Sequence, residues 1–427
     1  MTSSGNSLPS AHNITRVELP NGITLLVYEN FAAQSVVFSG SLNAGSLYES
    51  PAQNWLAAIT ASALMRGTDT RDFQTIASAL EDIGADLDVS AGLHRVGFSG
   101  KSLAEDLPLM IELLADVLLH PAFPTAQVER LRGEILTGLQ IRSQDTRYRA
   151  RRAFYEALYP AEHPYHYSTG GKIETPSAIT IDQMRQFHRT QYGPQGMILV
   201  VVGAVKADDV IAIIRHQFEG WSNPEQPPVP TLPSISLPEA TRRTYISLAG
   251  KTQSDLILGS IGPSRFAPDY LASMLVNCVL GQFGMMGRIG ATVREELGLA
   301  YYAYSALDGG LGPSPWSVIA GVNPANLDLA INQIRQQLQR ITTELVSEED
   351  LNNVQSYFVG RLPLQLESNE GIVGAIMNME LYGLGLDYLL GYRDRIQALT
   401  REDLLRAAQH YLNPEAYVLG IAGPATT

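Results

Sequence analysis

The chain has 427 residues, of which 45% are hydrophobic and 17% are charged, so it has ample material for a hydrophobic core. Its formal net charge of -13 argues against a surface built to bind nucleic acid or an anionic membrane. The single cysteine, Cys278, excludes an intrachain disulfide framework and a metal cluster held by cysteines. No apolar run approaches the roughly 18 residues that a membrane span needs, and no export signal is visible. We therefore expect no signal peptide and no membrane insertion, and a location in the cytoplasm or an organelle stroma.

The first half of the chain alternates between strand-like and helix-like patterns. Strands are predicted over residues 14–29, as a hairpin that turns at Asn21-Gly22, and over residues 35–42, 86–99 and 196–205. Helices are predicted over residues 54–65, 72–83, 107–119, 125–142 and 181–191. This mixture is typical of an α+β architecture.

An internal repeat divides the chain nearly in half. Six prolines fall between Trp221 and Pro238 with little hydrophobic periodicity, which predicts an extended linker. The halves on either side resemble each other at an offset of 220 residues, and three features keep this register. They are a helix-capping segment at residues 178–182 and 398–402, a proline at 194 and 414, and a glycine that closes an apolar strand at 203 and 423.

We therefore predict an α+β fold with two homologous halves, each a mainly antiparallel sheet with helices packed on one face. The two halves are expected to face each other as a clamshell. The predicted boundaries are a disordered tail at residues 1–13, an N-terminal α+β domain at 14–222, a proline-rich linker at 223–241 and a C-terminal α+β domain at 242–427.

Residues 281–305 are the most informative segment of the chain. A series of glycines leads into a predicted helix over residues 291–297, which ends at Gly298, and residues 300–305 then alternate like a strand. Arg294 falls in the last turn of this helix. A tight turn from helix to strand could therefore bring its guanidinium near the hydroxyl of Tyr301. Together they would offer the N–H and O–H donors that suit a backbone carbonyl or an oxyanion.

Other interpretations of this segment stay open on the residues alone. Arg294 could merely complement the helix dipole, and Tyr301 could be an ordinary packing residue of a strand. The glycine series also resembles a dinucleotide-binding loop. That fingerprint requires a strand directly before it, however, and residues 271–280 are predicted to be helical.

Several short motifs together resemble the pitrilysin (insulinase) superfamily of zinc peptidases, which includes processing-type enzymes. Each motif is weak alone, but their order between residues 14 and 424 makes the combination specific. The motifs are residues 20–25 (PNGITL), 43–46 (NAGS) followed by Glu49, 66–68 (RGT), 163–165 (HPY) and 294–301 (REELGLAY).

The catalytic motif of that superfamily, H-x-x-E-H, is absent from this sequence. In the motif two histidines one helical turn apart bind zinc, and the glutamate takes a proton from the metal-bound water. The resemblance places the three motif positions at Ala58, Ala61 and Ser62, and the third zinc ligand, a glutamate in the family, at Leu139. None of these side chains suits the chemistry. We therefore expect no metal or other cofactor in this chain and no complete catalytic centre of its own.

The sequence shows no replacement for the lost centre. His163 and His166 form an H-x-x-H pattern, but they lie in a proline-containing loop and are interpreted as structural or solvent-exposed. Glu129 and Glu134 share a predicted helix with Leu139 but have no histidines in register with them. No Ser/His/Asp arrangement and no phosphate-binding loop is found.

The resemblance implies a division of labour between two chains. In two-chain members of the superfamily one chain carries the zinc motif, while its partner lacks the motif and supplies an Arg/Tyr pair. Arg294 and Tyr301 match that pair in type and in their spacing of seven. The chain is thus interpreted as the non-catalytic, substrate-binding subunit of a heterodimeric zinc peptidase, with zinc in a homologous partner and unfolded peptides as substrates. The alternatives are an assembly subunit, like the core proteins of respiratory complexes, and a peptide-binding homodimer without hydrolysis.

Overall fold

A computed structural model describes residues 8–167 and 174–425, and within these residues the strands form a six-stranded and a five-stranded sheet. The chain divides into two compact units, each built around one sheet. The first unit contains the described residues up to Thr137, from 174 to Thr231 and from Leu362 to Tyr392. The second contains Gly138 to 167, Leu232 to Arg361 and the residues from Arg393 onward. The predicted α+β fold with two sheets is confirmed.

The sheet of the first unit has the strand order β1-β2-β6-β3-β5-β4, and only β2 and β6 run parallel to each other. Its strands are β1 (Ile14–Glu18), β2 (Thr24–Glu29), β3 (Ser35–Leu42), β4 (Asp86–Ala91), β5 (Val96–Leu103) and β6 (Ile198–Gly203). The helices are α1 (Leu56–Leu64), α2 (Phe73–Glu81), α3 (Leu107–Leu119), the first part of α4 (Thr125–Ser143), α6 (Thr175–Ala178), α7 (Ile181–Gln191), α8 (Ala207–Phe218) and α13 (Asn369–Leu381). The strands and helices predicted for this half are all present, with the segment 86–99 resolved as the hairpin of β4 and β5.

The sheet of the second unit has the order β7-β11-β8-β10-β9, and only β7 and β11 are parallel. Its strands are β7 (Arg242–Ser247), β8 (Ser254–Ile261), β9 (Ala300–Leu307), β10 (Pro315–Val322) and β11 (Val418–Gly423). The helices are α5 (Thr146–Leu158), α9 (Tyr270–Gly281), α10 (Phe283–Ile289), α11 (Leu327–Thr343), most of α12 (Glu348–Gln365), α14 (Tyr392–Gln397) and α15 (Arg401–Tyr411). A short π-helical segment, η5 (Gly290–Glu296), continues α10.

The two sheets share one topology, which supports the internal repeat. The order β2-β6-β3-β5-β4 in the first unit corresponds to β7-β11-β8-β10-β9 in the second, including the one parallel pair. β6 and β11 begin at residues 198 and 418, so they keep the offset of 220 found in the sequence. α7 and α15 both begin with a capping box, made by Thr180 with Gln183 and by Thr400 with Asp403.

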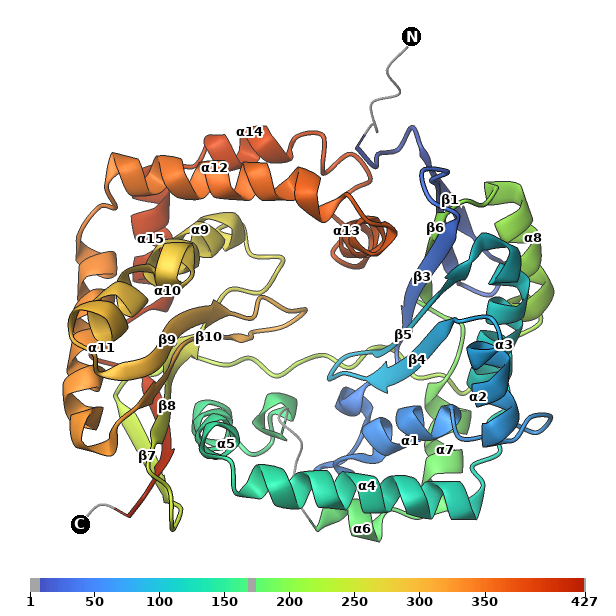
Figure 1. Cartoon of the computed structure of the whole chain (residues 1–427), viewed down its shortest axis with the longest axis horizontal. Helices are drawn as coiled ribbons and strands as arrows, with labels where there is room; N and C mark the ends of the chain where they lie inside the picture. The colour runs from blue at the N-terminus through green and yellow to red at the C-terminus, as the bar shows by residue number, and fades with distance from the viewer. Residues whose placement is uncertain (1–7, 168–173, 426–427) are drawn as a thin grey trace. The chain divides into compact units, whose positions relative to one another are not determined.

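Each sheet carries one helix that comes from the other half of the sequence. α5 precedes the proline-rich segment but packs on β7, β8 and β11 of the second unit, whereas α13 packs on β3 and β6 of the first unit (Figure 1). α13 does so on the face opposite to the main helical layer, through a separate core that includes Val200, Val202, Ile372 and Ile376. The sequence did not predict a helix on this second face.

The compact units therefore differ from the two halves of the sequence in these exchanged segments. The segment between α8 and β7 contains no helix or strand among its described residues. Of the tail predicted to be disordered, residues 1–7 lie outside the described part of the chain. Residues 8–13 include a turn in which the amide of Asn13 donates to the carbonyl of Ser10 at 3.1 Å, and Ser10 is buried.

The contact between α5 and β11 gives a test of this packing. A Cβ atom at Gly420 of β11 would lie 2.4 Å from the carbonyl oxygen of Ala150 and 2.5 Å from the amide nitrogen of Phe154, both in α5. Gly420→Ala should therefore lower the free energy of unfolding by about 1–3 kcal/mol, measured by urea titration. Gly374→Ala in α13 is the control, because no heavy atom lies within 4 Å of its added Cβ. It should be neutral or stabilising by up to about 1 kcal/mol. Equal stabilities of the two variants would contradict the close contact.

Candidate functional site

The positions that the resemblance assigns to the zinc motif lie on α1, and their side chains do not fit a metal. Ala58 and Ser62 are half-buried and one helical turn apart, whereas Ala61 between them is fully buried in the core of the first unit. The fourth position, Leu139, is 1% exposed and lies on the part of α4 that belongs to the second unit. Methyl and isobutyl groups offer no ligand atom and no general base, and a serine hydroxyl is a poor zinc ligand. These residues therefore cannot hold zinc.

The carboxylate of Glu49 caps the N-terminus of α1 by accepting hydrogen bonds from its first backbone N–H groups. The carboxylate of Glu49 accepts hydrogen bonds from the backbone N–H of Ala57 at 2.9 Å and of Trp55 at 3.1 Å. Trp55, the N-cap residue, has φ of 85°, which is the left-handed region. Burial raises the pKa of Glu49 to about 7 although these two hydrogen bonds act in the opposite direction. The carboxyl group thus holds the backbone at the start of α1, and its burial there makes its charged form less favourable.

The histidines and glutamates considered in the sequence analysis have structural partners. His163 is buried, stacks on Tyr159 with a centroid distance of 5.0 Å and accepts the backbone N–H of Tyr165 at Nδ1. Nδ1 of His166 lies 2.8 Å from the carbonyl oxygen of Tyr159. Glu129 and Glu134 form ion pairs with neighbouring arginines. Over residues 8–167 and 174–425, no group of three or more His, Cys, Asp or Glu side chains could hold a metal ion.

Arg294 lies in η5, where the helix widens to π-helical hydrogen bonding. The amide of Leu297 donates to the carbonyl of Thr292, and the amide of Leu299 donates to the carbonyl of Val293 at 2.9 Å. This second bond closes the turn at Gly298, which has φ of +60° and ends the helix as predicted. Short π-helical segments occur frequently at functional sites because they displace side chains from the regular helical register. The Arg294 side chain is 36% exposed, and its nearest ionic partner is Glu295 at 3.5 Å.

Tyr301 lies at an irregularity of β9. Gly321 of β10 pairs with Tyr302, but the next residue, Val322, pairs with Ala300, so Tyr301 is the extra residue of a β-bulge. Its neighbours on the alternating pattern, Ala303 and Ser305, are completely buried, whereas Tyr301 is 69% exposed. A bulge locally interrupts the strand pairing and re-aims a side chain. Among the described residues no hydrogen bond joins Tyr301 to Arg294, so the predicted approach of the two groups stays a prediction.

Next to this bulge, the structure shows a buried polar network that the sequence analysis missed. Asp255 of β8 is 3% exposed, and its carboxylate accepts hydrogen bonds from the hydroxyls of Tyr302 and Thr146 and, at 2.9 Å, from Nε2 of Gln253. Arg147 of α5 donates from Nε to the Tyr302 hydroxyl at 2.9 Å, with its guanidinium carbon 4.2 Å from the centre of the Tyr302 ring. The only sequence signal was an aspartate at the start of an apolar run, SDLILGSI.

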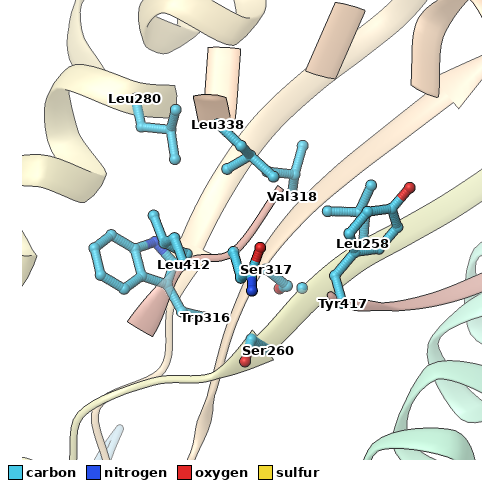
Figure 2. A pocket seen from close by; sticks show the side chains of 11 residues that line it. Leu258, Ser260, Leu280, Trp316, Ser317, Val318, Leu338, Leu412 and Tyr417 are labelled. Atoms are coloured by element: carbon cyan, nitrogen blue, oxygen red, sulfur yellow. The ribbon is translucent and has the colours of Figure 1, made fainter. Parts of the chain in front are cut away.

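Two cavities lie within single units, and neither is lined by Arg294 or Tyr301. In the second unit a cavity of about 10 Å³ lies between β8, β10 and the flanking helices, with Leu258, Trp316, Val318 and Leu412 among its walls (Figure 2). This volume holds about one water molecule. In the first unit an open depression of about 410 Å³ contains Arg132, whose guanidinium is already bonded to Glu129 and to the carbonyl of Pro176.

Comparison with known proteins decides the family. Residues 26–165 match the family model described as insulinase (peptidase family M16), and residues 178–358 match the model described as peptidase M16 inactive domain. The chain belongs to the pitrilysin, or insulinase, superfamily. The family predicted from the sequence motifs is thus confirmed. Together the two models cover both halves of the internal repeat.

Relatives of this pitrilysin-superfamily chain are similar over nearly their whole length. A protein described as an uncharacterized zinc protease of Streptomyces coelicolor is 26% identical over 419 residues, which cover 95% of this chain and 89% of that protein. The mitochondrial-processing peptidase subunit beta of Saccharomyces cerevisiae is 22% identical, covering 96% and 91%. The crystal structure of a peptidase M16 inactive domain from Pseudomonas fluorescens superposes with a TM-score of 0.89 and 25% identity, covering 97% and 98%.

The superfamily contains peptidases, and this chain is a peptidase-like member of it. None of the helices in the described part of the chain combines the length and the hydrophobicity that crossing a bilayer requires.

The raised pKa of Glu49 predicts a pH dependence of stability. A carboxyl group whose pKa is higher in the folded than in the unfolded state stabilises the fold below its unfolded pKa, and this contribution is lost as the pH rises through the folded value. Unfolding free energy should therefore fall between about pH 4.5 and 7, by up to about 1.4 kcal/mol per unit of pKa difference. Urea titrations at several pH values should show a flatter profile in Glu49→Gln. Asp72→Asn should keep the wild-type slope in this range, because hydrogen bonds from Thr75 lower the pKa of Asp72 below its usual value. An unchanged slope in Glu49→Gln would refute the assignment.

Proposed function

We propose that this chain is the non-catalytic, substrate-binding subunit of a heterodimeric zinc peptidase of the pitrilysin superfamily. A homologous partner would carry the zinc and the general base, and unfolded peptides would be the substrates. The observation that carries the proposal is the contrast between the two candidate sites. The α1 positions are filled by side chains without metal-binding chemistry, whereas Arg294 and Tyr301 extend donor groups from irregular backbone, and their side chains are 36% and 69% exposed.

The geometry of the turn supports a joint role for the two residues. The amide of Leu299 donates to the carbonyl of Val293. Val293 directly precedes Arg294, and Leu299 lies two residues before Tyr301, so this bond brings the backbone next to both residues together. Both long side chains therefore start from the same end of the second unit's sheet. A guanidinium and a phenol placed in this way can donate to one carbonyl oxygen, and a charge-assisted hydrogen bond contributes roughly 1.5–3 kcal/mol.

The comparisons are consistent with a subunit of an assembly. The yeast relative is named as one subunit of a processing peptidase, and several bacterial relatives are named as zinc proteases. In the proposed division of labour this chain contributes no step at the metal. Its residues bind the peptide backbone next to the scissile bond and hold donors at the position where negative charge develops.

Reconstitution of the complex tests the proposal. The chain should be co-expressed with a homologue from the same source that contains H-x-x-E-H, and cleavage of dye-labelled casein should be measured with and without this subunit. Tyr301→Phe and Arg294→Ala should each lower kcat by about 10²–10³, because each removes a donor aimed at developing charge. Both variants should still bind the partner.

Controls of the same residue types separate site effects from general damage. Arg340→Ala removes a surface arginine paired with Glu344 at 3.3 Å on α11, and Tyr357→Phe removes a phenol hydroxyl on α12. Both should leave kcat within about twofold, as expected for surface changes. Full activity of the zinc-bearing partner alone, or wild-type kcat in both site variants, would reject the proposal and would favour a role in assembly.

The substituted zinc positions give a separate prediction. The isolated wild-type chain should retain no stoichiometric zinc after dialysis, whereas Ala58→His/Ser62→His should bind added Zn²⁺ because it restores two imidazoles one helical turn apart. Isothermal titration calorimetry with zinc chloride measures both. Tight zinc binding by the wild-type chain would show that its metal centre lies elsewhere.

A further inference from the structure

The network around Asp255 joins the first turn of α5 to three strands of the second unit. Across the sheet, Asp255 of β8 pairs with Gly321 of β10, and Gly321 pairs with Tyr302 of β9. A Cβ atom at Gly321 would lie 2.5 Å from the Tyr302 ring and 2.9 Å from a carboxylate oxygen of Asp255. The Tyr302 side chain therefore crosses the strand between them in the space that the glycine leaves. Arg147 covers the ring from α5.

The same row in the first unit shows that the fold itself does not need this network. With β6 and β11 aligned at their offset of 220, the strand registers place four pairs of residues at equivalent positions. These are Val202 and Ala422, Val37 and Asp255, Lys101 and Gly321, and Asp86 and Tyr302. In the first unit a buried valine thus stands in place of the carboxylate. The helices also differ in their contacts. Glu370, the second residue of α13, bonds to the exposed Lys101, whereas Arg147, the second residue of α5, bonds to Tyr302.

A buried carboxylate costs several kcal/mol of desolvation unless it is fully bonded, and an apolar residue at such a site is often equally stable. Asp255 is satisfied by three donors, and this arrangement rigidifies the strands that it joins. Burial and the bond to Asp255 raise the pKa of Tyr302, so its hydroxyl stays protonated and remains a donor to the carboxylate. Tyr302 is thereby held by two contacts, because its hydroxyl bonds to Asp255 and the guanidinium of Arg147 lies over its ring.

We propose that Asp255, Tyr302 and Arg147 are positioning residues that fix the β-bulge from which Tyr301 reaches the substrate. Tyr302 directly follows the bulge residue, so a fixed Tyr302 sets the direction of the Tyr301 Cα–Cβ bond. The inference rests on the proposed role of Tyr301 but concerns different residues. It also assigns a task to α5, which comes from the other half of the sequence.

The first experiment needs no partner and tests the positioning directly. Hydrogen–deuterium exchange followed by mass spectrometry on the isolated chain reports the opening of the segment 297–305. Tyr302→Phe, which keeps the ring but removes the hydroxyl bonded to Asp255 and Arg147, should increase exchange in this segment. Tyr304→Phe is the matched control, because it removes a hydroxyl two residues along the same strand face, for which no hydrogen bond is found among the described residues; it should exchange like wild type. Equal exchange in Tyr302→Phe and wild type would overturn the inference.

The second experiment uses the reconstituted complex and a quenched fluorescent peptide taken from the casein sequence. Tyr302→Phe and Asp255→Asn should lower kcat about 10- to 100-fold with little change in KM, as expected when a reacting group is misplaced by a fraction of an ångström to an ångström. In a Tyr301→Phe background the same substitutions should have almost no further effect, because the group that they position is gone.

The outcomes separate the two proposals. If Tyr301→Phe and Arg294→Ala both leave kcat unchanged, the proposed function fails, whatever the exchange experiment shows. If Tyr301→Phe lowers kcat but Tyr302→Phe does not, or if the two effects multiply in the double variant, the positioning role fails and the proposed function stands. A loss of partner affinity in Tyr302→Phe, measured by size-exclusion chromatography, would assign the network to assembly and would also overturn the inference.

Discussion

The packing of α5 directly on the backbone of β11 is the contact on which the second unit depends. Gly420 lets the helix approach to a distance that any side chain would prevent. Because α5 lies this close to the sheet, its first turn reaches the strand beyond β11. Thr146 can then bond to Asp255, and Arg147 can cover Tyr302. A single glycine therefore places a helix from one half of the repeat against the candidate site in the other half. In the first unit the equivalent of Gly420 is a valine, and α13 packs there through side chains in an apolar core.

The two repeats share a topology but differ in the side chains at equivalent positions. In the first repeat, α1 is a short helix of alanine and other small or apolar residues, and most of it is buried. In the second, the row that crosses β8, β10 and β9 contains a buried carboxylate, a glycine and a tyrosine, where the first repeat has valine, lysine and aspartate. A requirement of the fold would act on both repeats, since the strands, their order and their registers correspond. The polar row of the second repeat is therefore better explained by the function of that unit than by the stability of the fold.

Local patterns in the sequence were sufficient for much of the fold. Alternation and capping predicted the strands around residues 14–42 and the helices up to residue 191, and three features at a fixed offset predicted the duplication. The sequence analysis predicted neither α5 nor α13, and their exchange depends on long-range packing, which local patterns do not contain. Alternation also assigned Tyr301 to the face of Ala303 and Ser305. Tyr301 is exposed by a bulge that arises from the pairing of β9 with β10. The sequence of β9 alone does not predict this pairing. The assignment of Ala58, Ala61 and Ser62 to the zinc-motif positions rests on the motif and its spacing alone.

Stability considerations treat the two candidate sites differently. Alanine is the best helix former, and Ala61 fills the core without a polar atom, so these residues on α1 favour the stability of the fold. The turn around Gly298 has the opposite character. A widened helix and a bulge both interrupt regular hydrogen bonding, and the residue at the bulge is a largely exposed tyrosine that adds little to packing. Stability alone can therefore account for the side chains on α1 but not for the arrangement of Arg294 and Tyr301. That asymmetry is the physical reason why we propose contact with a ligand for the second unit and metal chemistry for another chain.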